Sequence, residues 1–108
     1  MADDIKTEQH GTPDPLRVLA GYLERALDRA TSVVLMRHEP SICTVYLGDP
    51  SGPREDLRQI AAIPSSTADA MLSGTASGSN HIPIDGQPYR FVRSFTLIDD
   101  AAAVVFSA

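Results

Sequence analysis

The sequence predicts an α+β fold of two layers, in which helices pack on one face of an antiparallel sheet. The first observation is a helical repeat of apolar residues after Asp14. The second is a set of short apolar, β-branched runs in the rest of the chain. The third is the pair Asp85-Gly86 between two such runs. Both residues tolerate the positive φ that a tight hairpin turn needs, so this pair predicts antiparallel strands.

The chain of 108 residues is long enough for one small domain. Residues 1–13 are mostly polar, so we expect a flexible tail over 1–13 and a single α+β domain over 14–108. Asp14 is a good helix cap, and Pro15 suits the first helical position. Apolar residues then recur at helical spacing, which predicts a helix that ends near Ala30. They are Leu16, Leu19, Ala20, Leu23, Ala26 and Leu27.

Two strands are expected next. Ser32–Arg37 is apolar and β-branched, and Ile42–Leu47 alternates between two faces. The turn-like His38–Ser41 between them predicts an antiparallel pair. Gly48–Pro53 is rich in glycine and proline, which predicts a loop.

The segment Leu57–Ile63 is ambiguous from its residues alone. Local propensity favours a short helix that begins after Pro53, while the apolar run before Pro64 also fits a strand. A further helix is expected from Ser65 or Ser66, as the capping residue, through Leu72.

Gly74 is expected to end that helix, and Ser73–Asn80 reads as a flexible loop. Three extended runs follow, which predict an antiparallel meander with turns at Asp85-Gly86 and Ile98–Ala101. The runs are His81–Ile84, Tyr89–Leu97 and Ala102–Phe106.

Charge and hydropathy exclude several classes of partner. The net charge is −5 and the chain has no basic cluster, so neither nucleic acid nor an anionic membrane surface is an expected partner. No apolar stretch is long enough to span a membrane. The amino-terminal residues lack the pattern of a signal peptide, so a cytoplasmic protein is expected.

No catalytic or cofactor motif is recognisable. The loop over residues 74–79 is rich in Gly and Ser but lacks the lysine of a phosphate-binding loop, and a helix precedes it rather than follows it. Cys43 lies within an apolar run, which indicates a buried thiol. We therefore expect neither an enzyme nor a bound cofactor.

The sequence also predicts no metal site. His10, His38 and His81 lack the spacing of zinc ligands. Asp99 and Asp100 are adjacent in a turn, where their carboxylates point apart and are solvated rather than share acid–base work.

Two segments, Leu57–Ser66 and Pro83–Gln87, together resemble the amino-side domain of the ATPases that drive type II secretion and type IV pilus assembly. That domain carries an apolar strand ending in Pro, a helix, a Pro-x-Asp-Gly-Arg motif and two closing strands. The resemblance extends over Leu16–Ala108. It implies a PAS-like sheet with helices, and it favours a strand for Leu57–Ile63.

The chain departs from the family at several positions. Gln87 stands in place of the arginine, and Val33-Val34 replaces the usual Asp-Ile. The chain ends at Ala108, where the ATPase core would begin, and it has no Walker motif. The resemblance therefore implies an accessory domain that stands alone and does not hydrolyse ATP.

These observations predict a non-enzymatic interaction domain that docks to a protein partner, for example an ATPase or another secretion or pilus component. The expected partner-binding residues are Asp85, Gln87, Arg90 and Arg93, of which the two arginines should project from opposite faces of one strand. One alternative is a small acidic secretion chaperone or adaptor, normally a homodimer. Another is a PAS-like sensor of a small ligand.

Overall fold

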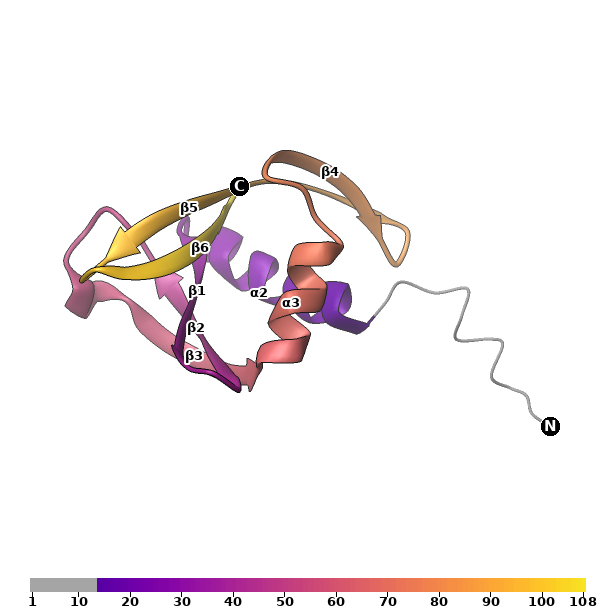
Figure 1. Ribbon diagram of the computed structural model, residues 1–108. Coiled ribbons are helices and arrows are strands. Elements are labelled where there is room, and N and C mark those ends of the chain that lie inside the picture. Colours follow the sequence, from indigo (N-terminus) through magenta and orange to yellow (C-terminus); the bar gives the residue numbers. More distant parts are fainter. Residues whose placement is uncertain (1–13) are drawn as a thin grey trace.

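Residues 14–108 of the computed structural model form one antiparallel sheet with two α-helices on one of its faces (Figure 1). This confirms the predicted α+β class, while the predicted tail over residues 1–13 lies outside the described residues. The sheet has six strands in the order β3-β2-β1-β6-β5-β4. The elements are α2 (Asp14–Asp28), β1 (Ser32–Glu39), β2 (Ile42–Gly48), β3 (Arg58–Pro64), α3 (Ser65–Ser73), β4 (Gly78–Ile84), β5 (Gln87–Ile98) and β6 (Ala101–Ser107).

Helix α2 buries most of the apolar face that its spacing predicts, including the fully buried Leu19, but the predicted Leu27 is exposed. It ends at Asp28, slightly before the predicted end near Ala30. Ala30 takes a left-handed conformation with φ of 52°, and the backbone N–H of Thr31 donates to the carbonyl of Ala26. This left-handed turn satisfies a terminal carbonyl and sends the chain into β1.

Alternate residues of each strand face opposite sides of the sheet. On the side of the helices, Val33 and Leu35 of β1 join the main core. Phe91 of β5 and Phe106 of β6 meet there edge to face, with ring centroids 5.8 Å apart. The main core therefore links α2 and α3 to the central strands.

The other face of the sheet carries a second, smaller core. Val34, Met36 and Tyr46 are buried there although neither α2 nor α3 covers them. The sheet curls, so the β2–β3 connection approaches the turn between β5 and β6 (Figure 1), where Arg54 Nε lies 3.6 Å from Asp99 Oδ2. The fold therefore has apolar packing on both faces of the sheet.

The ambiguous segment is a strand, as the resemblance favoured. A single 3₁₀ turn, Arg54–Asp56, precedes it, and β3 then pairs with β2. Leu57 is buried in the second core. Pairing and burial therefore override the local helical propensity of this segment.

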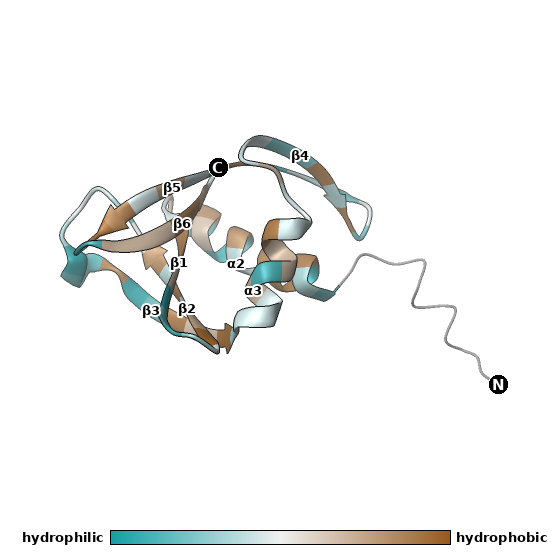
Figure 2. Cartoon of the chain, in the orientation of Figure 1, coloured by the Kyte–Doolittle hydropathy of each residue, from teal (hydrophilic) through white to brown (hydrophobic). Residues whose placement is uncertain are grey.

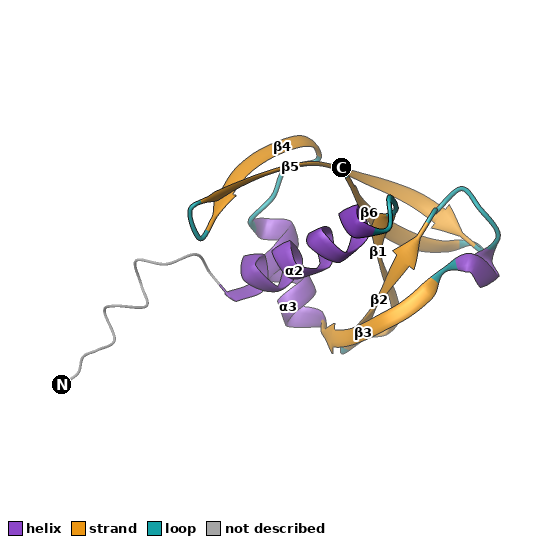
Figure 3. Cartoon of the chain, turned by 180° about the vertical axis from the view of Figure 1, so that it is seen from behind, coloured by secondary structure: helices purple, strands orange, loops and turns teal. Residues whose placement is uncertain are grey.

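Helix α3 begins at Ser65, but the predicted serine cap is wrong. Pro64 is the capping residue and makes no side-chain cap bond, while Ser65 Oγ donates to the carbonyl of Pro40 over 2.9 Å. The hydroxyl thus joins α3 to the β1–β2 turn. Viewed from behind, α3 crosses the sheet beside α2 (Figure 3). Gly74 follows the helix as its C-cap, as predicted.

The predicted loop Ser73–Asn80 is too long, because β4 begins at Gly78 rather than at His81. The side chain of Asn80 explains the difference. Its Oδ1 accepts from the N–H of Ala76, and its Nδ2 donates to the carbonyls of Ala76 and Gly78. These bonds hold the chain in a compact turn that leads directly into the strand.

Strand β5 is longer than predicted and is shared by two hairpins. It starts at Gln87 and ends at Ile98. The flanking turns have positive φ at both central residues, with 53° and 83° at Asp85-Gly86 and 51° and 66° at Asp99-Asp100. These are the values of the two-residue turns that match strand twist, so both predicted turns are confirmed.

Candidate functional site

The four predicted partner-binding residues belong to the hairpin of β4 and β5. Asp85 lies in its turn, and its Oδ1 accepts a hydrogen bond from Arg17 Nε over 3.1 Å. This ion pair ties the hairpin to α2. Gln87 begins β5 and is exposed, beside a pocket of about 190 Å³ between β5 and α2.

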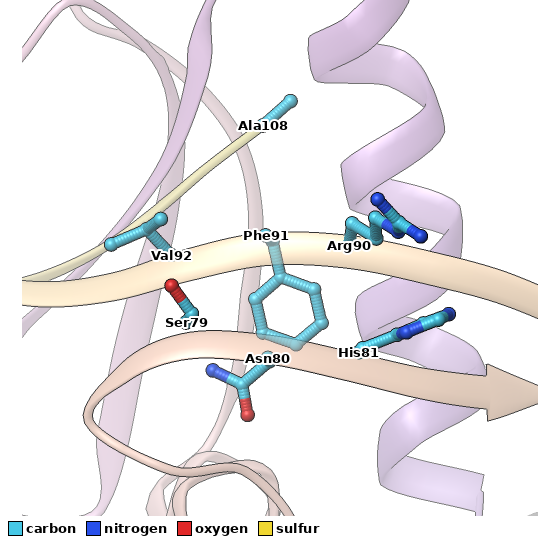
Figure 4. Close-up of a pocket in the computed structure, with 7 residues that line it drawn as sticks. All are labelled: Ser79, Asn80, His81, Arg90, Phe91, Val92 and Ala108. Carbon is cyan, nitrogen blue, oxygen red and sulfur yellow. The ribbon is translucent and has the colours of Figure 1, made fainter.

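Arg90 and Arg93 project to opposite faces of β5, as predicted. Arg90 is exposed, and its partner across the strand pair is His81. The two side chains lie next to one another (Figure 4) in the lining of a pocket of about 400 Å³. A guanidinium in this position is suited to bind a carboxylate or phosphate of a partner. The rest of the lining is Ser79, Asn80, Phe91, Val92 and Ala108.

Arg93 is engaged within the domain. Its Nη1 donates to the carbonyl of Leu72 over 2.8 Å, to the carbonyl of Thr75 over 3.0 Å and to Thr75 Oγ1 over 2.9 Å. Its Nε is buried without a hydrogen-bond partner in residues 14–108. The side chain thus fixes the carboxyl end of α3 to the sheet, and the geometry does not present it to a partner.

A second surface, which the sequence analysis did not single out, lies between α3 and the β5–β6 hairpin. We call it the hairpin groove. It has a volume of about 300 Å³ and is mainly apolar. It is lined by Leu35, Arg37, Cys43, Ala68, Asp69, Leu72, Phe95, Ala102 and Val104.

Phe95 lines this groove, and Leu97 lies two residues further along β5; both are large, exposed apolar side chains. Phe95 is 62% exposed and Leu97 is 69% exposed, on the same face of the sheet as α3. The carboxyl-terminal end of β5 appears brown in the hydropathy colouring (Figure 2). In the sequence, Phe95 and Leu97 alternate with Ser94 and Thr96. This pattern could have indicated an exposed apolar surface, but it fits a strand that covers a core equally well.

Polar groups define one side of the hairpin groove. Arg37 Nη2 lies 2.9 Å from Asp69 Oδ1 and joins β1 to α3. Cys43 is buried, as predicted, and burial raises the pKa of its thiol. A protonated, buried thiol is a poor nucleophile.

One polar cluster lies on the opposite face of the sheet, around the hydroxyl of Tyr46. His38 Nε2 lies 3.0 Å from this oxygen, and Arg54 Nη2 donates to it over 3.3 Å. The Arg54 guanidinium also lies over the Tyr46 ring, 4.9 Å from its centroid. Through its ion pair with Asp99, Arg54 links the β2–β3 connection to the β5–β6 turn, which is a structural role.

No family model, curated protein or solved structure matches this chain. Its own geometry therefore carries the functional argument. Within residues 14–108, no group of three or more His, Cys, Asp or Glu side chains is placed to hold a metal ion. No helix in that range is both long and apolar enough to cross a membrane.

A testable contact joins the β4–β5 hairpin to α2. The hydroxyl of Tyr89 donates to Glu24 Oε2 over 2.5 Å, and this bond raises the pKa of Tyr89 above its ordinary value. We expect Glu24→Gln to bring that pKa down, because the amide holds the phenol proton less strongly and carries no negative charge. Titration of tyrosinate absorbance measures the change.

The variant Asp28→Asn serves as the control, because Asp28 lies on the same helix but does not bond to Tyr89. It should leave the Tyr89 titration unchanged. The hydrogen bond that raises this pKa stabilises the fold fully at pH values below the pKa of Tyr89 in the unfolded chain. The contribution is lost as the pH rises through the pKa of Tyr89 in the folded protein. An unchanged Tyr89 titration in Glu24→Gln would contradict the assignment.

Proposed function

We propose that this chain is a non-enzymatic protein-interaction domain that docks through the hairpin groove and the adjoining Phe95 and Leu97. The exposure of these two side chains on one face of one strand carries the proposal. Aromatic and apolar side chains that gather beside a groove, with charged groups at its margin, are typical of protein-binding surfaces. Arg37 and Asp69 are such marginal groups here.

The resemblance to secretion and pilus ATPases suggests the class of partner. In that family the corresponding domain packs against ATPase cores. We propose a secretion or pilus component, such as an ATPase, as the partner. The net charge of −5 and the acidic Asp69, Asp99 and Asp100 near the surface favour a partner with basic residues around its contact.

The secretion chaperone or adaptor is a variant of the same proposal, since it would also act by docking. The small-ligand sensor has less support. A sensor needs room for a ligand between the sheet and its helices, but there Leu19, Val33, Met71 and Phe106 are fully buried and pack in one cluster. The packing favours docking at the surface over binding in the interior.

Leu97→Glu tests the proposed docking surface. We expect wild-type protein to recover a secretion or pilus component from the source cells, and Leu97→Glu to lose it, because a carboxylate is costly to bury in an apolar contact. Val92→Glu is the matched control, since Val92 is also exposed, at 41%, on the same strand but on the opposite face. Equal recovery by all three proteins would contradict the docking surface, and wild-type recovery of unrelated proteins only would contradict the partner class.

A further inference from the structure

Strand β5 has a free edge next to the proposed docking surface. Its first part, Gln87–Arg93, pairs with β4, and its last part, Val92–Ile98, pairs with β6. β4 begins opposite Arg93, so no described strand pairs with the β4 side of residues 94–98. We call this side of Ser94–Ile98 the β5 edge. It presents unpaired backbone groups that are suited to pair with another strand.

Several other strand edges of the sheet carry features that oppose such pairing. β3 carries Arg58 at one end and Pro64 at the other, and its register with β2 is interrupted by a shift. The outer edge of β4 contains Pro83. The first residues of β5, before Val92, are also unpaired on the side where β6 pairs further along the strand. This edge contains Pro88 and lies against α2. Proline, charge and register irregularities all discourage edge-to-edge association.

The β5 edge has none of these features. Ser94–Ile98 contains neither proline nor a charged residue, and it combines aromatic, β-branched and aliphatic side chains. Sequences of this composition pair readily when they lie at an exposed edge. Its unpaired backbone groups and this composition therefore suit the β5 edge to pair with another strand.

We propose that the β5 edge pairs with the same edge of a second copy of this chain, antiparallel and about a twofold axis at Thr96. In such a twofold pair, a residue a given number of positions before Thr96 faces the residue the same number of positions after Thr96 in the second copy. Thr96 then faces Thr96 of the second copy, and Phe95 faces Leu97 of the second copy. Both are favourable cross-strand pairs.

Charge selects the antiparallel arrangement. Each copy has a net charge of −5, and its acidic turn, Asp99-Asp100, follows the β5 edge directly. Parallel pairing would bring the two acidic turns together. The antiparallel register instead places the turn of one copy nearest Arg93 of the other, and the two copies meet along an uncharged segment.

This inference rests on the proposed function and deepens it. Phe95 and Leu97 point away from the plane of the sheet, so edge pairing leaves them accessible and brings four such side chains onto one face. The second copy thereby doubles the apolar docking surface. Pairing of two short edges buries less than the ~1,200 Å² of stable interfaces, so the dimer should dissociate on dilution.

Cysteine cross-linking tests the register. In a Cys43→Ala background, Thr96→Cys should form a disulfide-linked dimer under mild oxidation, because facing residues of an antiparallel pair have the spacing that a disulfide needs. Ser94→Cys is the control. Ser94 is the more exposed of the two residues but faces Ile98 of the second copy, so it should cross-link at least tenfold more slowly. Equal rates would overturn the proposal.

A charge exchange separates this inference from the docking proposal. Sedimentation of the full chain should show wild-type dimers that dissociate on dilution. Thr96→Arg alone and Thr96→Glu alone should be monomers, because like charges then meet at the axis, and an equimolar mixture should dimerise again. A monomeric wild type at all concentrations would overturn the twofold pairing. Docking would still stand in that case if Leu97→Glu lost the partner and Thr96→Arg retained it.

Discussion

Replacing Phe106 with alanine is expected to lower the free energy of unfolding by about 3–5 kcal/mol. Phe106 has no exposed surface, packs edge to face on Phe91 and belongs to the strand that joins β1 to β5. Its loss leaves a cavity where the helices meet the sheet. A domain of this size is stable by only about 5–15 kcal/mol, so the variant should unfold at much lower urea concentrations.

Phe95→Ala is the matched control for this prediction. The substitution is the same, but Phe95 is 62% exposed on the neighbouring strand. It should cost less than about 1 kcal/mol. Phe106→Leu should fall between the two, and it keeps the test usable if Phe106→Ala does not fold. Equal losses at Phe95 and Phe106 would mean that Phe95 is part of the core, which would contradict both the fold and the docking proposal.

Replacing Arg93 with alanine is expected to cost about 2 kcal/mol. The three hydrogen bonds of Nη1 are the contacts of Arg93 that hold the end of α3 and its following turn against β5. Bonds from a charged donor are each worth more than neutral ones, but the partly exposed site and the unsatisfied Nε reduce the net effect. Urea denaturation measures the loss.

Arg90→Ala provides the comparison for Arg93. Arg90 is exposed and makes no hydrogen bond or ion pair within residues 14–108. Its replacement should change stability by less than about 0.5 kcal/mol. The same two variants also address partner binding, because a loss of binding in Arg90→Ala without a loss of stability would assign Arg90 to a contact. Equal stability losses would refute the structural role of Arg93.

Local chemistry made part of this fold predictable. The pairs Asp85-Gly86 and Asp99-Asp100 predict their turns, because few residues adopt positive φ at low cost. The helical periodicity of Leu16, Leu19 and Leu23 likewise predicts α2. These features depend on residues that are close in the sequence, and the structure confirms them.

Other features depend on distant contacts and were missed for that reason. Ser65 looked like a helix cap, but its hydroxyl donates to the carbonyl of Pro40 in the β1–β2 turn, which is distant in the sequence. Arg93 looked like a free arginine on a strand. The alternation of side chains along the strand predicted that it faces away from Arg90, but not what it bonds to. Its partners at Leu72 and Thr75 are set by where α3 ends over the sheet. The early start of β4 depends on the amide of Asn80.

The candidate docking surface was hidden for a similar reason. Phe95 and Leu97 alternate as core residues do, and only the length and position of α3 decide whether they are covered. Their exposure is therefore a property of the assembled layers rather than of the strand sequence.

The strand order has a consequence for how the chain folds during synthesis. Apart from the contact of β1 with β6, every strand pair in the described sheet joins strands that are consecutive in the sequence. The chain therefore contains two meanders, each preceded by its own helix, and one long-range pairing, Val33–Met36 with Ala103–Phe106, unites them. Because the ribosome delivers the amino-terminal meander first, the inner edge of β1 stays open until β6 emerges. We expect the closing of this distant pair to be the slow, entropically costly step of folding.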